Sequence, residues 1–171
     1  IFAKYFPSIS AVPQTGFFCN NANAALSRKA WQQYRFDEDL TGLEDMHLAQ
    51  KLVNDGGKVG YVAEAAVYHH HDEHWPQVRR RFEREAIALQ RIMPQLHVGL
   101  LDTVRYIFSS FCKDIGQAWR ESIRINLVDV FRYRLNQYWG AYKGNHEHRR
   151  MSRAEKEKYF YRFCRLWTIL S

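Results

Sequence analysis

An amphipathic helical pattern, a pair of glycines and a β-type segment follow one another across residues 43–71, and this succession constrains the fold most strongly. Apolar residues at helical spacing predict a helix over residues 43–54, which Gly56 and Gly57 end. The stretches KVGYV and AAVYHHH within residues 58–71 are typical of extended chain. We therefore expect a domain in which strands and helices pack together.

Two acids open the predicted helix, and their angular positions separate them. At about 100° per residue, one apolar stripe collects the side chains of Leu43, Met46, Ala49, Leu52 and Val53. Glu44 lies roughly opposite the centre of this stripe, whereas Asp45 lies about 70° from it, at its edge. Asp45 is therefore the carboxylate predicted to turn inward. The alternative is that both acids only favour the positive end of the helix dipole.

Histidines cluster at the end of the β-type segment, where four occur within six residues: His69, His70, His71 and His74. In extended chain, Val67, His69 and His71 share one face. Imidazole nitrogens at this spacing can ligate a divalent cation, although an internal histidine run is more often a surface feature. Both interpretations stay open on the sequence alone.

Residues 15–25, TGFFCNNANAA, read as a short strand that enters a polar loop. Asn21 and Asn23 can place their amide groups against a ligand, or they can satisfy backbone groups in a turn. Ser27 is a good N-cap for the short helix predicted to follow in RKAWQQY.

The rest of the chain is predicted to be mainly helical. Helical periodicity covers residues 75–93, 100–118 and 122–142, and residues 149–165 form a last amphipathic pattern suited to packing on the helices or to a membrane surface. We place a boundary after Val78, between residues 1–78 and a basic helical extension over residues 79–171. No run of about 18 uncharged apolar residues occurs.

The net charge of +7 is unevenly distributed about this boundary. Residues 1–78 carry six Lys or Arg against nine Asp or Glu, a net of −3, and the remainder carries nineteen against nine, a net of +10. A basic surface suits phosphate-bearing partners, anionic lipids or nucleic acid, although a solvated helical face has the same composition. The aromatic residues of this half follow helical spacing, which indicates a core rather than a base-stacking platform.

Several motifs occur in a fixed order: NNANAALSRKAW, FDE at residues 36–38, GLED at residues 42–45, GG at residues 56–57 and VYH at residues 67–69. In this order the chain resembles the second half of inverting family 2 glycosyltransferases with the GT-A fold, over roughly residues 15–90. The resemblance implies an α/β class, or α+β in the isolated chain. It implies a partial GT-A fold, with a few strands and helices, followed by a mainly helical C-terminal region.

The resemblance also implies a mechanism. Asp45 corresponds to the general base, which removes the proton of an acceptor hydroxyl while that oxygen attacks the anomeric carbon of a nucleotide sugar. Glu44, Asn21 and Asn23 then line the sugar and acceptor side. The implied partners are a nucleotide-sugar donor and a saccharide or lipid-linked acceptor, with peripheral membrane contact from the cytoplasm and without nucleic acid.

The resemblance also assigns residues to the leaving diphosphate. His69, with His71 as its substitute on the same strand face, corresponds to the ligand of Mg²⁺ or Mn²⁺. Arg79, Arg80 and Arg81 correspond to basic residues that approach the diphosphate.

One departure from the family concerns the nucleotide-binding half, whose Rossmann-like β/α region and Asp-x-Asp motif have no counterpart here. The letters Asp37-Glu38-Asp39 occupy the position of the family's Phe-Asp-Glu triplet instead. We therefore expect a C-terminal part with little donor affinity of its own. The alternatives are a non-catalytic interaction module that binds nucleic acid or anionic lipid through its basic half and, last, a stand-alone metal-binding protein.

Overall fold

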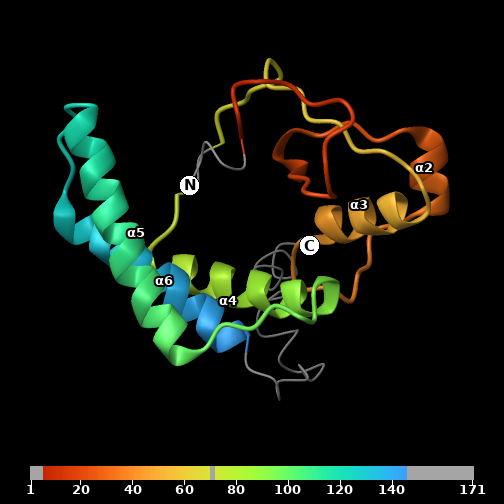
Figure 1. Ribbon diagram of the computed structural model, residues 1–171. Helices are drawn as coiled ribbons and strands as arrows, with labels where there is room; N and C mark the ends of the chain where they lie inside the picture. The colour runs from red at the N-terminus through yellow and green to blue at the C-terminus, as the bar shows by residue number, and fades with distance from the viewer. Residues whose placement is uncertain (1–5, 70–71, 146–171) are drawn as a thin grey trace, which may run out of the picture.

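The computed structural model describes residues 6–69 and 72–145, and helices account for 56% of these residues (Figure 1). The elements in chain order are η1 (Asn21–Asn23), α2 (Arg28–Gln33), α3 (Glu44–Asn54), α4 (Trp75–Ile92), α5 (Leu100–Arg120) and α6 (Leu127–Gly144). The long helices α4, α5 and α6 pack together, and the shorter elements lie on the other side of α4 (Figure 1). In the described part of the chain, no helix combines the length and the apolar character needed to cross a membrane.

The predicted α/β class is wrong, because the described residues form no sheet. Within residues 6–69 and 72–145, two extended segments meet at an isolated antiparallel bridge, in which the amides and carbonyls of Ala11 and Tyr61 exchange hydrogen bonds of 2.9 and 2.8 Å. The Gln14 amide adds a bond of 2.8 Å to the Val59 carbonyl. A ribbon of two extended segments without a third strand is marginal, so the β-type residues 58–69 stay extended but form no sheet. The partial GT-A arrangement of strands is overturned with it.

The predicted helices are confirmed, with shifts at their ends. The hydroxyl of Ser27 accepts a hydrogen bond from the Ala30 amide and caps α2. The helix predicted over residues 122–142 begins later, at Leu127, because Ser122 takes a left-handed φ of 54° and Asn126 provides the cap. The helix predicted over residues 149–165 lies outside the described residues.

Two glycines let α6 approach α4 more closely than any side chain would allow. Gly140 and Gly144 are one helical turn apart, and a Cβ atom at either would overlap a carbonyl oxygen of α4, that of Arg79 or that of Glu83. The ring of Phe82 meets Tyr133 edge to face beside this contact. The α4–α6 interface therefore includes a close contact between backbones, with side chains packed beside it.

The α5–α6 hairpin is held by polar side chains and by rings. Arg134 of α6 donates two hydrogen bonds, of 2.6 and 2.8 Å, to the Asp114 carboxylate of α5. The hydroxyls of Ser110 and Tyr138 are 2.7 Å apart. Such a bidentate, partly buried pair fixes the register of the two helices.

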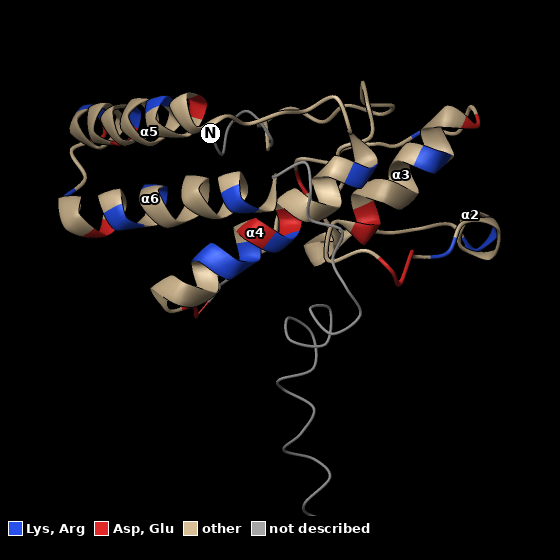
Figure 2. Cartoon of the chain, turned by 90° about the horizontal axis from the view of Figure 1, so that it is seen from below, with Lys and Arg blue, Asp and Glu red and all other residues tan. Residues whose placement is uncertain are grey.

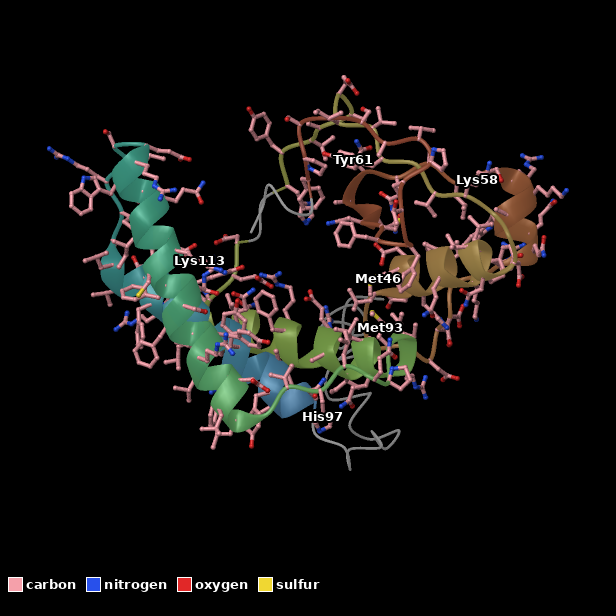
Figure 3. The ribbon with its side chains drawn as sticks, viewed as in Figure 1. Met46, Lys58, Tyr61, Met93, His97 and Lys113 are labelled. Carbon is pink, nitrogen blue, oxygen red and sulfur yellow. The ribbon has the colours of Figure 1, made fainter. Side chains whose placement is uncertain are left out.

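Helix α3 lies against α4 through individual hydrogen bonds. The Thr41 hydroxyl, just before α3, donates to the Arg84 carbonyl at 2.7 Å, and the Gln50 amide donates to the Ile92 carbonyl at 2.8 Å. Figure 3 places Met46 on α3 near Met93 at the end of α4. These bonds set the start of α3 beside the middle of α4.

Candidate functional site

The Asp45 carboxylate is fixed at the start of α3 by two backbone amides. The Asn21 N–H donates to Oδ2 at 2.6 Å, and the Met46 N–H donates to Oδ1 at 2.7 Å. A carboxylate offers about four acceptor positions, so these bonds hold the group while leaving acceptor capacity on each oxygen. Asp45 is partly exposed, as is Glu44 beside it. A ligand hydroxyl can therefore reach an oriented carboxylate at the positive end of a helix.

The turn into α3 explains how Asp45 reaches this position. Leu43, the N-cap of α3, has a left-handed φ of 58°, a conformation that costs a non-glycine residue about 1 kcal/mol or more. The preceding Gly42 lies against α4, where a Cβ atom would meet the Glu85 side chain at 3.9 Å. The strained turn thus brings the acidic first turn of α3 next to α4, as Figure 2 also shows.

The predicted asparagines contribute in two different ways. Asn21 contacts Asp45 through its backbone amide. The Asn23 side chain donates to the Ala65 carbonyl, which ties η1 to the extended segment before the histidines. Asn20 accepts from the Ala22 amide at 2.9 Å and caps η1. The structure therefore brings Asn21 to Asp45, and it uses the amide of Asn23 to hold the loop.

Two further ionisable groups lie in the electrostatic range of Asp45. Burial, and then the negative charge of Asp45, raise the pKa of the Cys19 thiol. Burial also raises the pKa of the Glu85 carboxyl; Arg81 and Arg84 oppose this shift, and Asp45 adds to it. We call Cys19, Asn21, Glu44, Asp45 and Glu85 the Asp45 site.

The three predicted arginines do not share one direction. Consecutive residues of a helix are separated by about 100°, so Arg79, Arg80 and Arg81 spread over about 200° around α4. Arg81 lies on the same side as Glu85, at 3.9 Å, and pairs with Glu73 at 2.9 Å. Arg80 is exposed, and the Arg79 carbonyl faces Gly140. Of the three, Arg81 is the one placed beside the Asp45 site.

The predicted metal ligands do not gather into a site within the described residues. His69 is exposed in an extended segment, and His71 lies outside the described residues. Within residues 6–69 and 72–145, no three His, Cys, Asp or Glu side chains lie close enough together to hold a metal ion. The role of Mg²⁺ or Mn²⁺ stays a prediction.

A pocket of about 320 Å³ lies at the other end of α3, lined by residues that include Lys29, Gln33 and Tyr34 of α2 and its cap and Asp55 to Gly57 beyond α3. The Tyr34 hydroxyl donates to the Asp55 carboxylate at 2.6 Å at its edge. Because α3 spans eleven residues, about 16 Å separate this pocket from the Asp45 site.

Sequence reasoning missed Glu85 and Cys19. The spacing of four between Arg81 and Glu85 signals an ion pair on one helix face and could have drawn attention to Glu85. Cys19 carries no comparable signal, because its relation to Asp45 arises only when the loop folds against α3.

A scan against models of protein families and searches of curated proteins and of solved structures found no match.

Proposed function

We propose that this chain supplies the catalytic base and acceptor side of an inverting glycosyltransferase. The observation that carries the proposal is the Asp45 carboxylate, held by the amides of Asn21 and Met46 and open to a further donor. The ordered motifs of residues 20–69 support it, because Asp45 stands where the resembling enzymes have their base. The proposal concerns this carboxylate and its neighbours and no longer includes an α/β fold.

In the proposed reaction, Asp45 accepts the proton of an acceptor hydroxyl. The hydroxyl oxygen forms a new bond to the anomeric carbon of the donor sugar, and the bond from that carbon to the diphosphate oxygen breaks, with inversion. The nucleoside diphosphate leaves with the electron pair. The two backbone hydrogen bonds keep the carboxylate from rotating away from the acceptor, which is the positioning that general-base catalysis requires.

Neighbouring residues have distinct parts in this proposal. Glu44, partly exposed next to Asp45, hydrogen-bonds hydroxyls of the acceptor, and Asn21 and Asn23 maintain the loop beside it. The donor's nucleotide is bound by residues outside these 171, because the family's nucleotide-binding motifs have no counterpart among them. The acceptor is a saccharide or a lipid-linked saccharide.

The test uses the whole reading frame that contains this chain. Release of nucleoside diphosphate is measured with a panel of nucleotide sugars and saccharide acceptors. Asp45→Asn is expected to lower kcat by about 10²- to 10⁴-fold, the usual contribution of a general base, with the donor KM within about threefold.

The matched control is Asp55→Asn, which changes an exposed carboxylate at the opposite end of the same helix. It should leave kcat within about twofold, since Asp55 contacts only the pocket side. Asp45→Asn with near-normal turnover would remove Asp45 from the base role. Micromolar binding of a nucleotide sugar to the 171-residue chain alone would refute the division of donor and acceptor sides.

A further inference from the structure

An apolar stripe runs along the outer side of α5. Leu101, Phe108 and Trp119 fall within about 20° of one direction around the helix, and their exposed fractions are 85%, 56% and 84%. The residues that α5 buries on its other side are Thr103, Ile107, Ser110 and Ala118, of which Ile107 is the one large apolar residue. Helix α5 thus leaves three large apolar side chains largely exposed along one direction.

Helix α6 continues this apolar surface. Val128 and Leu135, 55% and 40% exposed, share one direction on α6, and Leu135 lies about 140–180° around the helix from the glycines that contact α4. The ring centroids of Phe108 on α5 and Phe131 on α6 are 6.3 Å apart, and this contact joins the two stripes. We call Leu101, Phe108, Trp119, Val128 and Leu135 the hairpin apolar face.

Exposed basic residues flank the hairpin apolar face on both edges. Arg105, Lys113 and Arg120 lie about 40–120° from the stripe on α5, and Arg132 lies about 40–60° from Val128 and Leu135 on α6. Figure 2 shows the Lys and Arg positions along both helices, and Figure 3 labels Lys113 on α5. An apolar face bordered by basic side chains is the pattern of a helix that lies in the interface of an anionic membrane.

We propose that the α5–α6 hairpin docks on an anionic lipid surface, with its apolar face in the headgroup region and the four basic residues on lipid phosphates. At 21 residues, α5 provides a contact about 30 Å long. A second copy of the chain fits this face less well, because a symmetric pair would bring its basic edges together. The inference is independent of the proposed glycosyl transfer.

The experiment is co-sedimentation of the 171-residue chain with vesicles of phosphatidylcholine alone and with about 30% phosphatidylglycerol. We expect binding to the mixed vesicles that weakens as salt rises. A basic residue near an anionic surface contributes about fivefold in binding, so Arg105→Gln, Lys113→Gln and Arg120→Gln together should weaken it by at least about tenfold. Leu101→Gln with Trp119→Gln should also weaken it by at least about tenfold, and their high exposure leaves the fold intact.

The matched charge control is Arg28→Gln, Lys51→Gln and Lys58→Gln, which removes the same charge from exposed positions elsewhere and should keep binding within about twofold. A fluorophore on Cys112, which is exposed and about 20° from the stripe, should shift to the blue on binding when the other cysteines are serine.

Absence of binding, equal losses in the control and the basic triple variant, or an unchanged Cys112 probe would each overturn the proposal. Analytical ultracentrifugation without lipid supplies the competing outcome. A dimer that Leu101→Gln with Trp119→Gln dissociates would assign the face to a second copy instead.

Discussion

The two sides of α4 are built by different means. On one side, α6 meets α4 backbone to backbone at Gly140 and Gly144, and α5 is locked to α6 by the Arg134–Asp114 pair. On the other side, single hydrogen bonds from Thr41 and Gln50 tie α3 to α4. The Asp45 site lies on this second, sparsely tied side. The comparison shows a close-packed helical platform that carries loops, the usual arrangement when a scaffold positions functional residues.

The largest expected effect concerns the packed side. Gly144→Ala should destabilise the chain by about 2 kcal/mol, because the new methyl group overlaps the Glu83 carbonyl and forces α6 away from α4. Urea unfolding followed by circular dichroism measures the change. Gly116→Ala in α5 is the control: a Cβ atom there meets nothing within 4 Å, so the better helix former should stabilise by about 1 kcal/mol. Equal midpoints for the two variants would mean that the close backbone contact is absent.

A smaller effect is expected on the sparsely tied side. Thr41→Val should lower the free energy of unfolding by about 1 kcal/mol, since it removes the bond to the Arg84 carbonyl while keeping the volume of a buried side chain. Thr15→Val changes an exposed threonine and should stay within about 0.5 kcal/mol. If Thr41→Val matched Gly144→Ala in its cost, the contrast between the two sides would disappear.

The smallest expected effect is on the pH dependence of the free energy of unfolding, to which two glutamates contribute with opposite signs. Burial raises the pKa of Glu85 above its ordinary value of 4.5. As pH rises from this ordinary value to the raised one, the unfolded chain loses the proton before the folded chain does. The folded state therefore loses stability over this pH range. The Ser10 hydroxyl donates to Glu64 at 2.6 Å and lowers the pKa of that exposed carboxyl, which therefore contributes stability that is lost as pH falls.

Urea midpoints at pH 4 and pH 7.5 distinguish the two glutamates. Relative to the wild type, the stability of Glu85→Gln should be higher at pH 7.5 than at pH 4. The relative stability of Glu64→Gln should be lower at pH 7.5 than at pH 4. Identical pH dependences in the two variants would show that Glu85 is not desolvated against α4.

Local patterns were sufficient to predict the helices, because caps such as Ser27 and stops such as Gly56 act within a few residues. The sheet failed because residues 58–69 have β-type composition, but a strand also needs neighbours, and Ala11 to Gln14 are the only extended residues that pair with them in the described part of the chain. Strand propensity alone does not supply those neighbours.

The candidate site, like the sheet, could be predicted from local sequence only in part. The helical angle placed Asp45 at the edge of the apolar stripe, and the described structure brings it to Asn21. The presence of Glu85 and Cys19 near it depends on how α4 and the loop before η1 fold against α3, which no local spacing encodes. The arginines show the opposite case: Arg79, Arg80 and Arg81 are adjacent in the sequence, but on a helix their side chains point in three different directions.

The backbone contact between α4 and α6 determines where the sequence can vary. The carbonyl oxygens of Arg79 and Glu83 face the glycines, so the closest atoms of α4 in this contact belong to its backbone. On α6, Gly140 and Gly144 determine how closely the helices approach, because any side chain at either position would separate them. On α4, Ala86 shares this restriction, because it is buried and its Cβ atom lies beside Gly144. Close approach of the two helices therefore limits substitution on both of them, at the two glycines most of all.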